Sequence, residues 1–185
     1  MKNTVYIISG PTASGKSLIA YYLAKRINGE IVNCDSIQLY KYMDIGSAKP
    51  SEKAMSEVKH HLYSIEDPSV NMTVADYRTL AIETIDDILA RGKTPIVCGG
   101  TGLYLNAILY DMDFGAAPDD EQRRQELEEL AAERGAQYMH SYLQALDPDS
   151  ASRIHPNNTR KIIRAIEAYE HGKGIKDLSE CEIRS

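Results

Sequence analysis

The chain has 185 residues, 43% of them hydrophobic, which is enough for one domain with a buried core, with or without a small insertion. Its formal net charge is −6 and its isoelectric point is near 5.4. Proteins that coat nucleic acids without sequence preference are usually basic, so the composition disfavours that class. A local basic patch that recognises one RNA is still allowed, whereas the apolar runs are too short to span a membrane.

The three cysteines, Cys34, Cys98 and Cys181, lack the paired spacing of a metal site. Cys34 and Cys98 fall in expected strands and are predicted to be core residues. No signal-like segment precedes the first expected strand. Together with the odd number of cysteines, this favours a protein of the reducing cytoplasm.

Residues 10–17 read GPTASGKS, which is the P-loop pattern of a glycine, four residues and Gly-Lys-Ser. The apolar residues 5–8 predict a buried strand directly before it. The sequence LIAYYLAKRI at 18–27 predicts an amphipathic helix directly after it. Strand, glycine loop and helix in this order favour a phosphate site over a turn that binds nothing.

Each part of this loop has a chemical use. Gly10 and Gly15 allow backbone angles with which N–H groups turn inward around phosphate oxygens, at the positive end of the following helix. Lys16 adds a full positive charge, and the Ser17 hydroxyl is a candidate ligand for Mg²⁺. The sequence therefore predicts a diphosphate or polyphosphate site, without specifying the reaction.

Residues 30–36, EIVNCDS, predict a second buried strand that ends at Asp35 and Ser36. Ligands of open α/β sheets bind at the carboxyl ends of the strands, so we expect Asp35 to face the same crevice as the P-loop. The alternative is an aspartate that only caps the following turn.

The apolar residues of 37–51 follow neither the helix nor the strand periodicity, so this segment is predicted to be an ordered loop. Its Lys41 and Lys49 fit either a phosphate contact or solvated surface. His60 and His61 are adjacent and cannot face one metal together from a helix or strand, so we expect them in a loop or at the edge of the core.

A helix is predicted from Thr73, its N-cap, to residue 90, with Asp76 three residues later as an imperfect capping box. Residues 94–98 then predict a third strand, which runs into Gly-Gly-Thr-Gly. An ordinary P-loop ATPase commonly has a metal-binding aspartate at this point. Here Thr101 is expected to cap the next helix and to be available to a ligand.

The composition changes at residue 116. Pro118 and Asp119 are expected to start a charged helix, and a second helix follows and stops at Asp147. A last helix carries Arg160 and Arg164 four residues apart, on one face. The pair fits surface charge and a phosphate clamp equally well.

These elements predict an α/β fold, namely a P-loop NTPase-like three-layer fold with a parallel sheet and a small helical insertion. We expect a P-loop core at 1–115, a helical insertion at 116–152, and a return helix of the core with a short tail at 153–185.

Several separate motifs, in this order, resemble the tRNA dimethylallyltransferases, also called tRNA isopentenyltransferases. They are GPTASGKS, the Asp-Ser at 35–36 with Gln38 and Tyr40, MDIGSAKP at 43–50, GGTGLY at 99–104, and RIHPNNTRKIIRAIE at 153–167. The resemblance runs from residue 4 to about residue 174.

The resemblance implies transfer of a dimethylallyl group from dimethylallyl diphosphate to N6 of adenosine 37 in tRNA, with Mg²⁺ and without ATP hydrolysis. It implies that the chain binds dimethylallyl diphosphate and tRNA, and that the insertion at 116–152 faces the tRNA. We also expect a monomer that needs no membrane. Asp35 is then the general base, Thr101 a second catalytic residue, and Ser17 the metal ligand. The residues implied for the diphosphate are Gly10, Thr12, Ala13, Ser14, Gly15, Lys16, Ser17, Arg160 and Arg164. Those implied for tRNA are Asp35, Ser36, Ile37, Gln38, Thr101, Arg123, Arg160, Lys161 and Arg164.

Members of this family usually continue for about a hundred more residues, close to a small domain's length. The chain is therefore expected to be truncated relative to the family, with one sheet edge open. Three alternatives stay open: a small-molecule P-loop kinase, an adenylate isopentenyltransferase, and an inactive protein that binds diphosphate or tRNA.

Overall fold

A computed structural model describes residues 4–111, 121–171 and 181–183. The chain divides into two compact units, residues 1–111 with 182–185 and residues 112–181. Within the described ranges, no helix combines the length and the hydropathy that a membrane span requires. The expected boundary near residue 115 and the helix start at Pro118 lie outside the described residues.

The first unit is built on a four-stranded sheet. Its strands are β1 (Tyr6–Ile8), β2 (Gly29–Asn33), β3 (His60–His61) and β4 (Thr94–Cys98). They lie in the order β1-β4-β2-β3, and all three pairs are parallel. Parallel neighbours need crossover connections, which here contain α1 (Lys16–Ile27), α2 (Glu52–Glu57) and α3 (Val74–Ala90). A further helix, α4 (Gly102–Leu109), follows β4.

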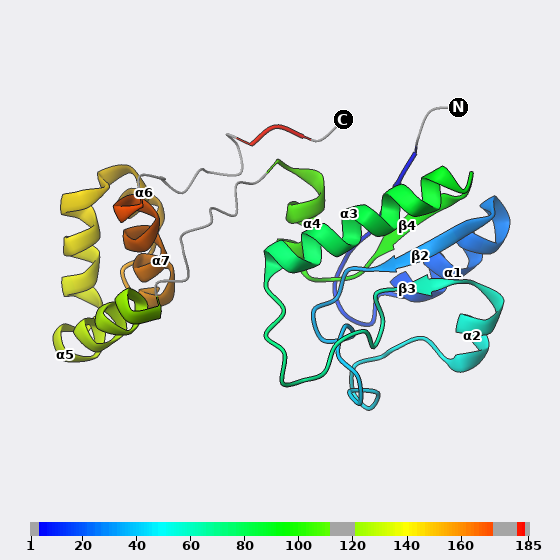
Figure 1. The fold of residues 1–185 in the computed structure, drawn as a ribbon, viewed down its shortest axis with the longest axis horizontal. Helices are drawn as coiled ribbons and strands as arrows, with labels where there is room; N and C mark the ends of the chain where they lie inside the picture. Colours follow the sequence, from blue (N-terminus) through cyan, green and yellow to red (C-terminus); the bar gives the residue numbers. More distant parts are fainter. Residues whose placement is uncertain (1–3, 112–120, 172–180, 184–185) are drawn as a thin grey trace. The chain divides into compact units, whose positions relative to one another are not determined.

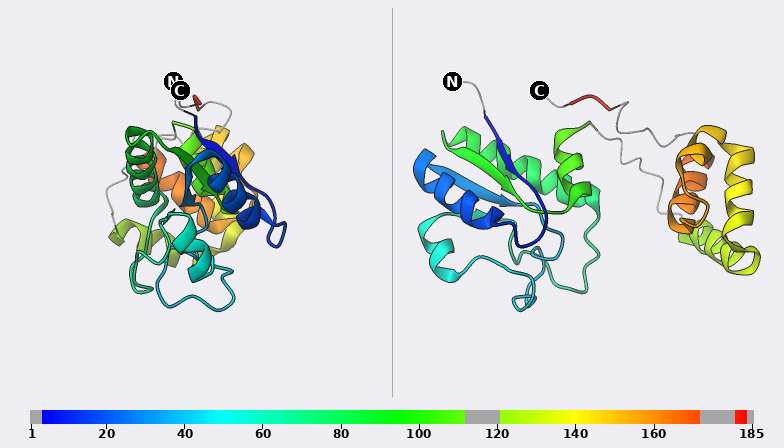
Figure 2. Two further views of the ribbon diagram at one scale, coloured as in Figure 1. Left: turned by 90° about the vertical axis from the view of Figure 1, so that its right-hand side faces the viewer. Right: turned by 180° about the vertical axis from the view of Figure 1, so that it is seen from behind.

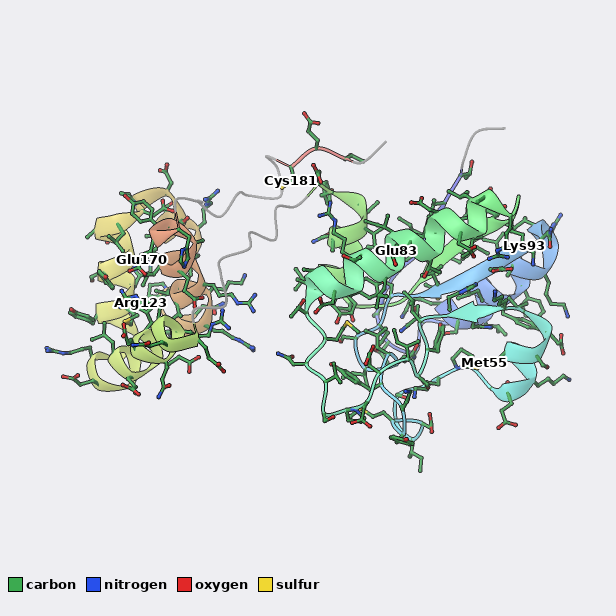
Figure 3. The ribbon with its side chains drawn as sticks, viewed as in Figure 1. Met55, Glu83, Lys93, Arg123, Glu170 and Cys181 are labelled. Atoms are coloured by element: carbon green, nitrogen blue, oxygen red, sulfur yellow. The ribbon has the colours of Figure 1, made fainter. Side chains whose placement is uncertain are left out.

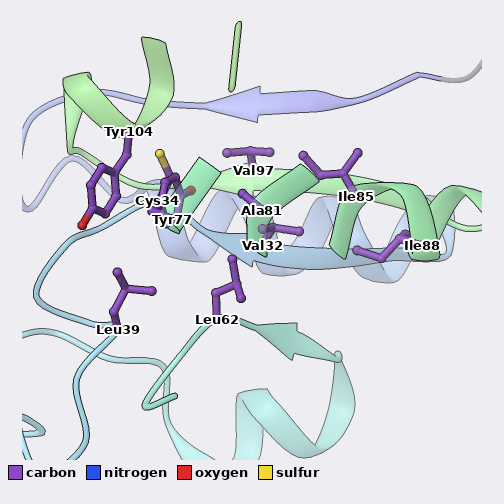
Figure 4. Packing of buried hydrophobic residues seen from close by; sticks show 10 residues of the cluster. All are labelled: Val32, Cys34, Leu39, Leu62, Tyr77, Ala81, Ile85, Ile88, Val97 and Tyr104. Atoms are coloured by element: carbon purple, nitrogen blue, oxygen red, sulfur yellow. The ribbon is translucent and has the colours of Figure 1, made fainter. Parts of the chain in front are cut away.

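Helices cover both faces of this sheet (Figure 1). Val32 and Val97 point to the face covered by α3 and α4, where they pack with the buried Tyr77 (Figure 4). Ile31 and Ile96 point to the other face and pack against α1. Two layers of helix around a parallel sheet confirm the predicted three-layer α/β fold.

The capping of α3 follows the sequence prediction. The Thr73 side chain accepts a hydrogen bond from the Asp76 backbone N–H, and Asp76 accepts one from the Thr73 backbone. This capping box fixes where α3 begins, and thereby which of its residues face the sheet.

Two predictions about the strands are only partly right. The strand expected at residues 5–8 forms, but it is not buried: Tyr6 is 43% exposed because β1 lies at the end of the strand order, with β4 as its one partner among the described strands. His60 and His61 are not in a loop but form β3 and pair with β2; they are half-buried at the other end of the strand order, which agrees with the alternative expectation of a position at the core edge.

The second unit contains α5 (Glu121–Leu146), α6 (Pro148–Arg153) and α7 (Thr159–Glu170). Gly135, with φ 82° and ψ 169°, interrupts α5 and separates the two helices that the sequence predicted there. The short α6 was not predicted; Asp147 caps it by accepting from the Ser150 N–H. Figure 2 shows these helices from two further sides.

The helices of the second unit share one apolar core. Leu127, Met139 and Leu143 of α5 pack with Ile162 and Ile166 of α7, and all five side chains are fully buried. The sequence predicts that residues 153–185 return to the sheet domain as a helix with a short tail. In the structure α7 instead packs with residues of α5 and α6 and belongs to the second unit.

A buried ion cluster joins the starts of the strands in the first unit. The Glu30 carboxylate is 1% exposed and receives hydrogen bonds of 2.7 Å from Arg91, Lys93 and His61. The Arg91 contact is the largest cause that holds the pKa of Glu30 well below its usual range, against the opposing effect of burial. Glu30 therefore stays ionised and ties β2 to β3 and to the turn after α3.

Glu30→Gln is expected to lower the free energy of unfolding at neutral pH by about 1–3 kcal/mol, because three basic groups lose their charged acceptor. Since folding lowers the pKa of Glu30 from 4.5, its stabilisation is present above pH 4.5 and is lost as the pH falls below it. Urea unfolding at several pH values measures both effects.

Asp87→Asn is the matched control, because Asp87 is 60% exposed and contacts the same Arg91. We expect it to change stability much less than Glu30→Gln. Equal losses in the two variants would contradict a special role of the buried carboxylate.

Candidate functional site

The P-loop has the backbone shape that an anion site requires. Gly10 and Gly15 have φ values of 148° and 84°, a region that favours glycine. Gly15 is also the N-cap of α1, and among the described residues no side chain caps this helix. The first N–H groups of α1 are thus left for an anion, at the positive end of the helix dipole.

Lys16 and Ser17 supply the side chains of this loop. The Lys16 ammonium donates a hydrogen bond of 2.6 Å to the Pro11 carbonyl oxygen and so lies back across the loop. An ammonium has three donors, so it can keep one such bond and still bind a phosphate oxygen. Ser17 follows within the first turn of α1 and adds one hydroxyl to the same place.

Asp35 lies just beyond the carboxyl end of β2. Its Oδ1 accepts hydrogen bonds from the backbone N–H groups of Ile37 at 2.9 Å and of Gln38 at 3.4 Å. The turn-capping role considered from the sequence is therefore real. These hydrogen bonds involve only Oδ1 of the carboxylate. No donor contacts the other oxygen, Oδ2, within the described part of the chain. Asp35 is held in orientation and still has an oxygen that can accept a proton.

The loop after β4 lies against both of these segments. The Thr101 N–H donates to the Cys34 carbonyl at 3.1 Å, and the Thr101 Oγ1 accepts from the Ser36 N–H at 3.0 Å. A Cβ on Gly100 would lie 3.6 Å from the Gly10 carbonyl oxygen of the P-loop. The structure thus brings the P-loop, Asp35, Ser36 and Thr101 together at the carboxyl ends of the strands.

Thr101 differs from its expected role in one respect. It stands at the N-cap position of α4, but its side chain makes no capping hydrogen bond to that helix. The hydroxyl instead connects α4 to the start of the loop after β2, because Ser36 is the nearer donor. Thr101 is therefore a link between two loops of the site.

The long loop after β2 is fixed by its own side chains. The Gln38 Nε2 donates to the Ser47 carbonyl at 2.7 Å, while the Lys49 Nζ donates to the Tyr40 carbonyl at 2.6 Å. The Lys49 side chain is only 6% exposed and pairs with Asp44, so neither role considered for it from the sequence applies. Ile37, in contrast, is 51% exposed beside Asp35 and is accessible to a ligand.

A cavity of ≈ 390 Å³ opens next to Ser17, between α1 and α2. The sheet residues Ile31 and Cys98 also line it, as does Tyr63. Burial raises the pKa of the Cys98 thiol, while the nearby Lys16 lowers it. Burial likewise raises the pKa of the Cys34 thiol to about 11. Both thiols therefore stay protonated near neutral pH, as expected of core cysteines.

The basic residues predicted in the second unit have different surroundings. Arg123 donates to Glu170 of α7 at 2.6 Å and to Glu126 at 2.9 Å, so its charge is already compensated (Figure 3). Arg160, Lys161 and Arg164 are exposed on α7. Within the described ranges no carboxylate pairs with these three side chains.

The site offers few ligands to a metal ion. Among the described residues, no group of three or more His, Cys, Asp or Glu side chains could hold one. Mg²⁺ commonly keeps several waters and is bound through one or two protein groups together with substrate phosphates. A single hydroxyl such as that of Ser17 beside a bound diphosphate fits this mode.

Sequence reasoning missed the walls of the cavity. Tyr63, Leu18 and Cys98 line it, although they come from three separate elements. Leu18 is 60% exposed, whereas an apolar residue of an amphipathic helix is expected to face the core. No sequence signal combines these residues, because Leu18 is on α1, Cys98 ends β4 and Tyr63 follows β3, and only the tertiary fold brings the three together.

The family model described as IPP transferase matches residues 38–184 of this chain. A tRNA dimethylallyltransferase of Acetivibrio thermocellus is 47% identical over 182 residues, which cover 98% of this chain and 58% of that protein. A tRNA dimethylallyltransferase of Geobacillus thermodenitrificans is 49% identical, with coverages of 98% and 57%. The chain thus spans rather more than half the length of these curated relatives.

Solved structures give the same match. The full-length tRNA isopentenylpyrophosphate transferase of Bacillus halodurans superposes with a TM-score of 0.61 at 45% identity, covering 91% of this chain and 56% of that one. A eukaryotic dimethylallyltransferase, studied while acting on tRNA, superposes with a TM-score of 0.80 at 31% identity, covering 97% and 45%.

Lys16→Ala is expected to weaken the binding of inorganic diphosphate by about 1.5–3 kcal/mol, roughly 10- to 100-fold, because one charge-assisted contact is lost. Isothermal titration calorimetry measures this directly. The melting temperature should stay the same, since the Lys16 side chain lies in an exposed loop.

Lys25→Ala, on the same helix but paired with Glu57, is the control and should bind diphosphate as the unmutated chain does. Wild-type affinity in the Lys16 variant would show that the loop does not bind the diphosphate.

Proposed function

The chain belongs to the IPP transferase family, and on that premise we propose that it transfers a dimethylallyl group from dimethylallyl diphosphate to N6 of adenosine 37 in tRNA. One observation carries the proposal. The loop after β4 contacts both the P-loop, through Gly100, and the segment after Asp35, through Thr101, and one oxygen of the Asp35 carboxylate has no donor among the described residues. A site for a leaving diphosphate and a site for a proton are thus adjacent.

The P-loop would hold the donor substrate. Loss of diphosphate from the allylic carbon leaves negative charge on the phosphate oxygens, and fixed donors around them stabilise that charge. The backbone of residues 12–17, the first turn of α1 and the Lys16 ammonium are such donors. When bound at Ser17, Mg²⁺ would add positive charge to the same oxygens.

Asp35 would take the proton. The amine of adenine is a weak nucleophile, because its lone pair is delocalised into the ring, so a base close by is required. In the transfer, the carbon–oxygen bond breaks and diphosphate leaves with the electron pair. N6 forms the new bond to the allylic carbon, and its proton passes to the free Oδ2 of Asp35.

The segment beside Asp35 would receive the nucleotide. Ser36, Ile37, Gln38 and Thr101 surround the carboxylate, and the hydrogen bonds of Gln38 and Thr101 hold this segment in place. Adenosine 37 must leave its base stack to reach a carboxylate at the sheet edge, so base flipping is part of the proposal.

The second unit would bind tRNA through α7. Arg160, Lys161 and Arg164 carry uncompensated charge, which suits contacts with the RNA backbone. Arg160 and Arg164 remain proposed diphosphate contacts as well. Arg123 is the weaker candidate for tRNA, because it would first have to leave Glu170.

A small-molecule kinase is less well supported. Phosphoryl transfer from ATP commonly uses an acid at the end of the strand that corresponds to β4. Here β4 ends at Cys98 and is followed by two glycines. An adenylate isopentenyltransferase shares the donor chemistry and differs in the acceptor.

Labelled dimethylallyl diphosphate, offered with tRNA, AMP or ADP as acceptor, tests the proposal against these alternatives. Label in tRNA is the expected result. Label in AMP or ADP instead would identify the adenylate enzyme, and ATP turnover with a small acceptor would identify a kinase. Binding of diphosphate or tRNA without transfer would leave an inactive binding protein.

Asp35→Asn is expected to bind both substrates nearly normally and to lose turnover by about 10²–10⁴-fold, because the amide cannot accept the proton. Single-turnover prenyl transfer across a Mg²⁺ titration measures the loss. A low plateau at saturating Mg²⁺ supports the base, whereas recovery of the rate would make Asp35 a metal ligand.

Replacing Arg160 and Arg164 together with Ala should weaken tRNA binding and reduce its dependence on salt. Each lost phosphate contact lowers the slope of log K against log salt by about 0.7–0.9. The double variant should therefore have a slope smaller by up to about 1.8.

Arg26 and Lys59 are exposed residues of the first unit without a proposed role. Their double alanine variant makes the same change in net charge and serves as the control. If both double variants lower the slope equally, α7 has no special part in binding tRNA.

A further inference from the structure

Asn33, the last residue of β2, carries a fully buried polar side chain two residues before Asp35. Its exposed fraction is 0%, so this side chain is shielded from solvent and from any substrate that binds at the surface. Burial of an amide costs free energy unless its donors and acceptors are hydrogen-bonded. The partners of the Asn33 amide therefore show which groups it holds in place.

The amide bonds both backbone polar groups of Asp35. Its Oδ1 accepts a hydrogen bond from the Asp35 N–H at 3.0 Å, and its Nδ2 donates one to the Asp35 carbonyl oxygen at 3.0 Å. Nδ2 also donates to the Leu62 carbonyl oxygen at 2.9 Å, in the segment after β3. A reversed amide would place Oδ1 against two carbonyl oxygens, so these three bonds define a single orientation.

These bonds restrict the direction in which the Asp35 side chain leaves the backbone. The N–H and the carbonyl lie on either side of the Asp35 Cα, so holding both restricts φ and ψ, the two soft torsions of the residue. The Cα–Cβ bond then has one direction. Beyond it, the hydrogen bonds of Oδ1 with the N–H groups of Ile37 and Gln38 limit the rotation of the carboxylate. Asn33 and the turn thus fix different parts of the same residue.

Asn33 is itself anchored by the helices that cover the sheet. The Tyr77 hydroxyl of α3 donates to the Asn33 carbonyl oxygen at 2.8 Å. The Tyr77 ring stacks on that of Tyr104 in α4, with ring centroids 3.9 Å apart, and both rings are buried (Figure 4). The amide therefore acts from a closely packed part of the core, which resists displacement.

We propose that Asn33 is a positioning residue for Asp35: its amide holds the Asp35 backbone so that Oδ2 keeps the direction that proton transfer requires. The inference rests on the proposed function, in which Asp35 takes the proton of N6. A base must lie within hydrogen-bond reach of the proton, and a displacement of about 1 Å can cost about 100-fold in rate. Asn33 acts on the reaction only through Asp35.

The test is a double-mutant cycle of Asn33→Ala and Asp35→Asn, measured as single-turnover prenyl transfer to tRNA at saturating Mg²⁺ and substrates. Asn33→Ala alone should lower the rate about 10- to 100-fold. In the Asp35→Asn background it should lower the rate by less than about 2-fold, because the base that it positions is already absent. The affinity for inorganic diphosphate, measured by calorimetry, should stay the same in Asn33→Ala.

Glu30→Gln is the matched control, because Glu30 is a buried polar residue of the same strand at the opposite end from Asp35. It is expected to lower stability and to keep the transfer rate of the unmutated chain. If Asn33→Ala does not fold, as judged by circular dichroism, Asn33→Ser makes the same cycle with a smaller expected loss of rate. A serine hydroxyl can still bond the N–H two residues further on, although more weakly.

The outcomes separate the two proposals. An unchanged rate in the Asn33 variant, or an equal loss of rate in both backgrounds, overturns the positioning role and leaves Asp35 as the base. Weaker diphosphate binding by the Asn33 variant would show a general disturbance of the site and would also overturn it. If Asp35→Asn keeps the full rate, or if the unmutated chain transfers no label, the proposed function is contradicted and the positioning role falls with it.

Discussion

Backbone contact between the ends of β2 and β4 leaves no space for a side chain at Gly99. A Cβ there would lie 2.0 Å from the Cys34 carbonyl oxygen, well inside any real contact. The close approach lets the Cys34 N–H bond the Cys98 carbonyl at 2.8 Å, and lets the Thr101 N–H bond the Cys34 carbonyl. The position of Thr101 beside Ser36 depends on this approach, as does that of Gly100 beside the P-loop.

Asp35, which follows Cys34, serves two purposes. A carboxylate that must accept a proton needs a fixed direction, yet a carboxylate bonded through both oxygens would be occupied. The turn after β2 resolves this conflict by bonding Oδ1 to the N–H groups of Ile37 and Gln38. The structural and the functional interpretation of Asp35, treated as alternatives on the sequence, are therefore compatible.

Local patterns predicted most of the order of the elements and the P-loop end of the site. The P-loop spacing, the capping residues at Thr73 and the continuous burial predicted for β2 each depend on residues near in sequence, and the structure agrees with them. The predictions that failed concern features that depend on residues far apart in the sequence. The exposure of Tyr6 follows from the strand order, and the burial of Lys49 from how its loop folds back. The cavity wall at Tyr63 depends on the pairing of β3 with β2, because Tyr63 follows β3, and no periodicity encodes that pairing.

Net charge is a poor guide to whether this chain can bind RNA. Ionic interactions are screened over about 8–10 Å at physiological salt, so a phosphate responds to the charges near it and little to the total of −6. On α5, Arg123 and Arg124 are compensated by Glu170 and Glu167 of α7. Those contacts hold the two helices together on one side of α7. They leave Arg160, Lys161 and Arg164 as the uncompensated charges of that helix. An acidic protein can thus present a cationic surface, because its acidic side chains are used within the fold.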